Sequence, residues 1–336
     1  MIASTINLKA SPKIPSKSER FMMDEVQWSN ENYTGATPRI SIPFSLRRLL
    51  SSYLGPAIRV RRSSDNAEED IYFNGEDLDE AALLGFVGSS SGFIRTWYDQ
   101  FGSLNANQTT TSAQPRIVLD GVIDRVNNKP AIFFNGAHFL LSGTAADWKW
   151  LQNDSESSGG IFVVSQCGIV DDPNTLYIIC GTSATIVSPG GFYLGFEDRI
   201  SVRENCIANL IGGNTSGTTY SLHRQEANTT LANQQFIAIH TRVNSGTAIE
   251  RSLMSTNNGL IQKGNTDTGT ANASNPRHGL KIGTSESSSG VNSFFMVGYI
   301  QELIFIKAHL LGLGFEQGFF YNANQYYKVY QYQNIL

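Results

Sequence analysis

The feature that most constrains the fold is a series of short apolar segments separated by turn signals at intervals of about ten residues. Apolar and polar side chains alternate within such segments, as at residues 58–61, which is the period expected of a strand with one buried face. Asn135-Gly136 is a strong hairpin signal, and Asn257-Asn258-Gly259 predicts another. Many short strands joined by turns predict an all-β sandwich. Further strands are predicted at residues 94–98, 116–119, 131–134, 139–141, 161–165, 176–180, 192–196, 200–203, 219–223, 236–242, 249–254, 280–283 and 294–306.

The composition agrees with a β-rich fold and excludes several classes of protein. Charged residues make up 16% of the 336 residues, against about 25% in an average soluble domain. The net charge is −4, and aromatic residues are not interleaved with Lys or Arg, so a nucleic-acid partner is not expected. The five histidines are scattered without a metal-ligand spacing. We therefore expect no metal and no cofactor.

The cysteines and the N-terminus bear on the compartment. Cys167, Cys180 and Cys206 are odd in number and have no CxxC spacing, so buried free thiols are expected. No apolar run of about 7–15 residues follows the first lysines, as a secretory signal would require. No apolar run approaches the roughly 18 residues of a membrane span. We expect synthesis in a cytoplasm and no membrane partner.

The chain divides into an arm and a sandwich. Residues 1–43 contain Pro12, Pro15, Pro38 and Pro43 and few periodic apolar positions, so they cannot bury enough surface to fold alone. We predict an extended N-terminal arm here, which either stays disordered or becomes ordered on a neighbouring subunit. Residues 44–336 are predicted to form one sandwich domain.

A few short helices are expected within the sandwich domain. Residues 44–53 have apolar side chains at helical spacing. In residues 78–87 the spacing is again helical, with Asp77 placed to cap the helix and Gly88 placed to end it. A C-terminal amphipathic helix is indicated by steps of three and four between Phe315, Phe319, Asn322, Tyr326 and Tyr330.

Four motifs carry a resemblance to a known family. They are IRVRRSSDNAEEDI at residues 58–71, LDEAALLGFV at 78–87, TWYDQFG at 96–102 and AQPRIV at 113–118. Together they resemble the alpha-L-arabinofuranosidase B catalytic domain, glycoside hydrolase family 54, in the form carried by virion proteins of tailed bacteriophages. The resemblance implies a concanavalin A-like jelly-roll β-sandwich. Phe101 departs from it, because the family usually has Ser there.

The resemblance also offers positions for catalysis. It implies Glu197 as the nucleophile of a retaining glycosidase and places Glu286 near the general acid, for which the family has Asp. Gly195 stands where the family has an Asp, and a lone Cys180 stands where it has a Cys-Cys pair. Because several parts of the sugar pocket are missing together, no catalytic residue is favoured. Hydrolysis by Glu197 and Glu286 remains the alternative.

The loop at residues 97–100 allows two interpretations. Trp97 and Tyr98 could stack on a sugar while Asp99 and Gln100 bond its hydroxyl groups. In the structural alternative, Trp97 lies in the core and the two polar side chains bond the backbone.

The function expected from the resemblance is that of a non-enzymatic phage virion structural protein. It would be a head decoration, head fibre or tail fibre subunit that presents a lectin-like surface for glycan or protein binding. The expected partners are other virion proteins, reached through the arm, host surface glycans and further copies of the chain.

Overall fold

The computed structural model describes residues 39–151, 159–168, 175–183, 191–199, 203–211, 221–225, 233–244, 249–257, 260–263, 275–286, 291–307, 319 and 322–329. Residues 1–38, which hold most of the predicted arm, lie outside the described residues. Within the described residues, no helix is long and apolar enough to cross a membrane.

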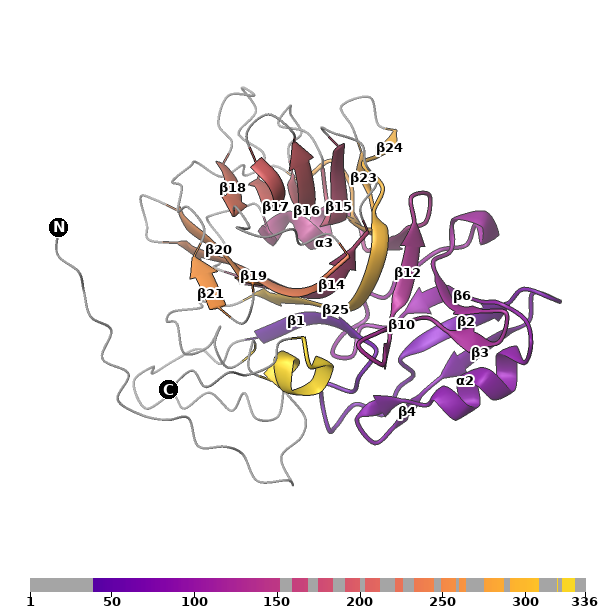
Figure 1. Cartoon of the computed structure of the whole chain (residues 1–336). Helices are drawn as coiled ribbons and strands as arrows, with labels where there is room; N and C mark the ends of the chain where they lie inside the picture. Colours follow the sequence, from indigo (N-terminus) through magenta and orange to yellow (C-terminus); the bar gives the residue numbers. More distant parts are fainter. Residues whose placement is uncertain are drawn as a thin grey trace.

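The molecule is a concanavalin A-like jelly-roll β-sandwich in which a single antiparallel sheet curls into two facing layers (Figure 1). One layer contains, in spatial order, β21 (Leu260–Lys263), β20 (Ile249–Asn257), β19 (Gln235–Asn244), β14 (Gly159–Cys167), β25 (Val297–Lys307) and β1 (Arg39–Ser45). The facing layer contains β18 (Ser221–Gln225), β17 (Arg203–Ile211), β16 (Phe192–Arg199), β15 (Thr175–Gly181), β22 (Leu280–Ile282), β13 (Leu140–Ser142), β7 (Ala106–Asn107), β6 (Gly92–Trp97), β2 (Ile58–Arg62) and β3 (Glu68–Ile71). The predicted fold class is confirmed.

Short elements complete the fold. The layers are joined through β12 (Ile132–Asn135), which pairs with both β25 and β8 (Arg116–Leu119), while β8 also pairs with β6. Small hairpins are formed by β4 (Phe73–Asn74) with β5 (Asp77–Leu78), β8 with β9 (Val122–Ile123), β10 (Arg125–Val126) with β11 (Lys129–Pro130), and β23 (Ser285–Glu286) with β24 (Asn292–Ser293). The short helices are α2 (Glu80–Val87), α3 (Ala145–Trp148), η1 (Thr111–Ala113) and η2 (Lys149–Leu151).

Aromatic side chains from distant parts of the chain fill the space between the layers. The ring of Phe44 on β1 lies 5.7 Å from that of Trp97, which ends β6. The ring of Phe305 on β25 lies 4.8 Å from that of Trp148 on α3. All four side chains are buried. Because each buried aromatic removes on the order of 150–250 Å² from water, this cluster is a main source of packing energy.

The predicted helix at residues 44–53 is wrong, and the sandwich begins before residue 44. Residues 39–45 form β1, which pairs with β25 in the register Phe44↔Leu303 and Ser45↔Glu302. Ile42 and Phe44 alternate into the core, so the strand pairing overrides the local helical spacing. Five residues assigned to the arm, 39–43, therefore belong to the sheet. Of the strand predicted at residues 200–203, residues 200–202 lie outside the described residues, and Arg203 is the first residue of β17.

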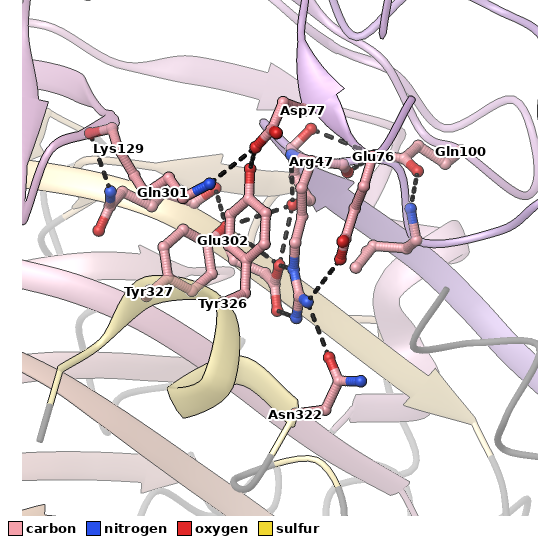
Figure 2. A network of polar contacts seen from close by, with 12 residues as sticks. Arg47, Glu76, Asp77, Gln100, Lys129, Gln301, Glu302, Asn322, Tyr326 and Tyr327 are labelled. Carbon is pink, nitrogen blue, oxygen red and sulfur yellow. Dashed lines mark hydrogen bonds and ion pairs between the residues drawn. The ribbon is translucent and has the colours of Figure 1, made fainter. Parts of the chain in front are cut away.

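The described part of the C-terminal helix confirms the prediction made from its spacing. Residues 322–327 are helical, and Phe319 stacks on Phe162 of β14 with ring centroids 4.2 Å apart. This helix lies on the outer side of the layer that contains β1 and β25 (Figure 1). A buried polar network, drawn in Figure 2, ties Asn322 and Tyr327 to Arg47 and Glu302 of the sheet. The helix is thus held by both apolar and polar contacts.

Two of the three cysteines match the expected buried free thiols. Cys167 and Cys180 are buried and form no disulfide. Burial raises the pKa of the Cys167 thiol to about 12 and that of the Cys180 thiol further still. Both thiols are therefore protonated and unreactive at neutral pH. The side chain of Cys206 lies outside the described residues.

Candidate functional site

The candidate site is a polar cluster around the β23–β24 hairpin, where the resemblance places Glu286. It rests on β22, which is paired on one side with β13 and on the other with β15. Gly283 has φ +89°, a conformation that favours glycine, and turns the chain from β22 towards the hairpin. In the hairpin Glu286 pairs with Asn292. The sheet thus fixes the base of this cluster.

Glu286 is held by two cations. Its Oε1 lies 2.5 Å from Lys281 Nζ, and its Oε2 lies 3.9 Å from Arg277 Nε. The same Lys281 ammonium donates to Asn292 Oδ1 across the hairpin. Lys281 is buried, which strengthens its interaction with a partner carboxylate relative to a surface pair. These contacts fix the position of the Glu286 carboxylate at the hairpin.

His278 supports the backbone of the β23–β24 hairpin and does not act as a general base. Its Nδ1 donates to the Gly279 carbonyl at 2.6 Å, because a carbonyl can only accept. Nε2 then accepts the backbone N–H of Glu286 at 3.3 Å. Burial lowers the pKa of His278 to about 4, so the ring is neutral at physiological pH. The ring positions the backbone of Glu286.

Exposed apolar side chains border the cluster. Val291 and Phe294 flank β24 and are 61% and 39% exposed. Phe294 has φ +58°, which is rare for a bulky residue. The Phe294 carbonyl accepts from Ile178 N of β15 at 2.9 Å, so the sheet holds this backbone in place. An exposed ring beside hydrogen-bonding side chains is an arrangement that suits a sugar.

The second candidate carboxylate, Glu197, lies on β16. Its backbone pairs with Leu176 of β15 and with Cys206 of β17, and its side chain lies outside the described residues. The neighbouring Gly195 leaves no room for the Asp of the family, since an added Cβ would lie 2.8 Å from the Tyr177 carbonyl oxygen. This backbone contact could be relieved only by moving a strand.

A cysteine directly after Cys180 is excluded by similar geometry. The residue after Cys180 is Gly181, where an added Cβ would lie 2.9 Å from the Phe192 carbonyl oxygen. The close pairing of β15 with β16 therefore allows no side chain at this position. Among the described residues, no group of three or more His, Cys, Asp or Glu side chains is arranged to hold a metal ion.

The loop at residues 97–100 has the structural role of the alternative interpretation in three of its four positions. Trp97 is fully buried. The Asp99 carboxylate accepts the backbone N–H groups of Phe101 and Leu104, and burial raises its pKa despite these bonds.

Gln100 fixes the segment that follows β1. Its Oε1 accepts Leu49 N at 2.8 Å, and its Nε2 donates to the Arg47 carbonyl at 2.8 Å. We therefore assign Trp97, Asp99 and Gln100 to the scaffold in place of ligand binding, because buried side chains cannot reach a sugar. Tyr98 is different: it remains partly exposed.

The fold of this chain is similar to that of known enzymes, although its sequence matches no known family. No protein-family model matches the chain, and no curated protein matches it. Solved structures do. A glycoside hydrolase family 54 α-L-arabinofuranosidase soaked with a cyclic sulfate inhibitor is 16% identical, covers 87% of this chain and gives a TM-score of 0.53. An arabinofuranosidase complexed with arabinofuranosyl-alpha-1,2-xylobiose is 15% identical, covers 87% of this chain and gives a TM-score of 0.52.

The chain shares their fold. It spans 63% of the length of the first of these structures and 62% of the second. The fold implied by the four motifs is therefore present. Sequence identities of 15–16% show a shared fold and say nothing about a shared activity. The sequence pattern did not indicate Lys281, Asn292 or Phe294 as site residues. A single lysine, or an aromatic residue before a strand, carries no signal of a site, and only the β23–β24 hairpin brings these residues together.

Proposed function

We propose that the protein is a non-enzymatic carbohydrate-binding sandwich. The observation that carries this proposal is the pairing of Glu286 with Lys281 and Arg277 beside the exposed ring of Phe294. A carboxylate held by two cations serves as a fixed hydrogen-bond acceptor, and an exposed ring serves as a stacking surface. The tight backbone at Gly195 and Gly181 further supports the loss of the family's catalytic pocket.

Glycan binding can be tested on an array of oligosaccharides that includes host surface polysaccharides. Phe294→Ala is expected to remove the signal, since it deletes the stacking surface while leaving the hairpin pairs intact. Val122→Ala is the matched control, because it removes an exposed apolar side chain from β9. An array without hits, or equal binding by both variants, would contradict the proposal.

The glycosidase alternative is tested with aryl α-L-arabinofuranosides. We expect no turnover above the uncatalysed rate. Turnover that disappears in Glu197→Gln, with thermal stability unchanged, would instead establish a retaining glycosidase with Glu197 as its nucleophile.

We further propose that the sandwich is a subunit of a tailed-phage virion, a head decoration, head fibre or tail fibre, that forms homo-oligomers and attaches to other virion proteins through the N-terminal arm. The resemblance of residues 58–118 to phage-borne domains supports this placement. Because β1 starts at Arg39, the test is deletion of residues 1–38. The deleted protein should fold but be absent from purified particles, and normal incorporation would rule out attachment through the arm.

A further inference from the structure

A second surface of the molecule, remote in sequence from the β23–β24 hairpin, also has the chemistry of a ligand site. It is the outer face of β3, β2 and β6, in which Arg59 pairs with Asp70 on one side and with Thr96 on the other. The opposite face of these strands is core, since Ile58 and Ile94 are fully buried. The strands are therefore held rigidly from behind, and their outer side chains stand on a fixed base.

The centre of this face is a fixed polar triad. Arg59 binds Asp70 with two parallel bonds, Nε to Oδ1 at 2.9 Å and Nη2 to Oδ2 at 2.7 Å. Tyr98 donates its hydroxyl to Asp70 Oδ1 at 2.7 Å. The Arg59 side chain is 42% exposed and that of Asp70 is 24% exposed. These groups are thus pre-positioned and open to solvent.

The triad keeps unused hydrogen-bonding capacity. An ionised carboxylate offers about four lone-pair sites, and the three bonds to Asp70 leave one of them on Oδ2. Within the described part of the chain, Arg59 Nη1 has no hydrogen-bond partner. An acceptor and a pair of donors therefore lie side by side, which matches adjacent hydroxyl groups of a sugar.

Two further tyrosines lie near the triad. Tyr72 follows Asp70 by two residues and is 49% exposed. Tyr53 is held by its hydroxyl, which donates to the Pro56 carbonyl at 2.9 Å, and by the edge-on ring of Phe73. Burial raises the pKa of Tyr53 most, and the charges of Asp99, Tyr72 and Asp70 act in the same direction. Together they raise this pKa to about 12. Tyr53 therefore keeps its proton at neutral pH. Ala57, next to Pro56, bonds the backbones of Ile71 and Tyr98, so the Tyr53 hydroxyl lies near the triad.

We propose that the face formed by Tyr53, Arg59, Asp70, Tyr72 and Tyr98 is a binding site for an uncharged pyranose glycan. The inference rests on the proposed glycan-binding function and adds a second site to it. The two charges cancel within the Arg59–Asp70 pair, so this pair offers no net charge to an ionic ligand. The exposed ring of Tyr72 offers an apolar surface to the C–H face of a pyranose, and the fixed triad lowers the entropy cost of binding.

Native affinity electrophoresis of the full chain tests this site. The gels contain dextran, mixed-linkage β-glucan or galactomannan, with dextran sulfate as a charged comparison. We expect the wild-type chain to be retarded in at least one neutral gel. Tyr72→Ala should weaken this retardation about tenfold or more. Tyr72→Phe keeps the ring and should stay within about twofold of wild type, and equal thermal unfolding of the variants verifies their folding.

The outcomes separate this site from the proposed function. Retardation that survives Tyr72→Ala but is lost in Phe294→Ala would overturn this second site and leave glycan binding at the β23–β24 hairpin. Wild-type retardation in dextran sulfate alone would also overturn it, because the face would then be ionic. No retardation in any neutral gel, together with an array without hits, would overturn both. Loss in Tyr72→Ala with retention in Phe294→Ala supports the site proposed here.

Discussion

At the scale of single residues, Arg47 shows how much stability rests on one buried charge pair. It is fully buried, and its guanidinium donates to Glu302 at 2.8 and 3.1 Å and to Asn322 at 2.7 Å (Figure 2). Arg47→Met leaves Glu302 as a buried charge without its main partner, so the free energy of unfolding should fall by about 3–5 kcal/mol. Urea unfolding measures this change.

A double-mutant cycle is the control for Arg47. Glu302→Leu added to Arg47→Met removes the uncompensated charge and should recover part of the lost stability. A single variant that loses less than about 1 kcal/mol would show that water reaches Glu302.

His278 makes a prediction about pH. The folded protein keeps the ring neutral with a pKa of about 4, while the unfolded chain has the ordinary value of about 6.5. Between these values the unfolded chain binds more protons, so the free energy of unfolding should fall as the pH falls from 6.5 to 4, by up to about 1.4 kcal/mol per pH unit. Thermal unfolding across this range should show a shallower slope for His278→Gln, and parallel slopes would contradict the assignment.

At the scale of elements, helix α2 carries two glycines with opposite roles. Asp79, rather than the predicted Asp77, caps the helix by accepting Ala82 N at 2.9 Å, and Gly88 ends it with φ 61° and ψ −133°. Gly88→Ala should therefore cost about 1–3 kcal/mol, because this backbone region is almost confined to glycine. Gly85 is exposed inside the helix, and Gly85→Ala should gain about 0.5–1 kcal/mol. Denaturant titrations measure the change in the free energy of unfolding for each variant. Changes of the same sign in both variants would contradict the prediction.

At the scale of the whole molecule, the boundary of the sandwich is set by β1. Deleting residues 1–38 should leave cooperative unfolding unchanged. Deleting residues 1–45 removes the partner of β25 and the buried Phe44, so cooperative unfolding should be lost. Calorimetry of both chains compares them directly. A cooperative transition in the shorter chain would mean that β1 is dispensable.

Much of this fold could be predicted from local patterns. The predicted hairpin at Asn135-Gly136 is wrong, because β12 pairs with β25 and β8 while β13 pairs with β22 and β7. By contrast, Ile58 and Val60 are buried on β2 as their alternation predicts, and the spacing of Phe319 and Asn322 matches the final helix. These features depend on neighbours within a few residues, so the sequence displays them. The helix predicted at residues 44–53 is wrong, because its apolar side chains lie on the end of β1 and in the turns that follow this strand.

The sequence by itself determined the fold class, through period-two alternation, turn residues and four motifs that resemble those of a known family. Only the tertiary structure decided the sites. Arg47 meets Glu302 across 255 residues, and Tyr98 meets Asp70 across 28. Tertiary packing likewise buries Trp97, Asp99 and Gln100 and leaves Tyr98 partly exposed. Strand pairing brings such residues together, and no local period encodes which strands will pair.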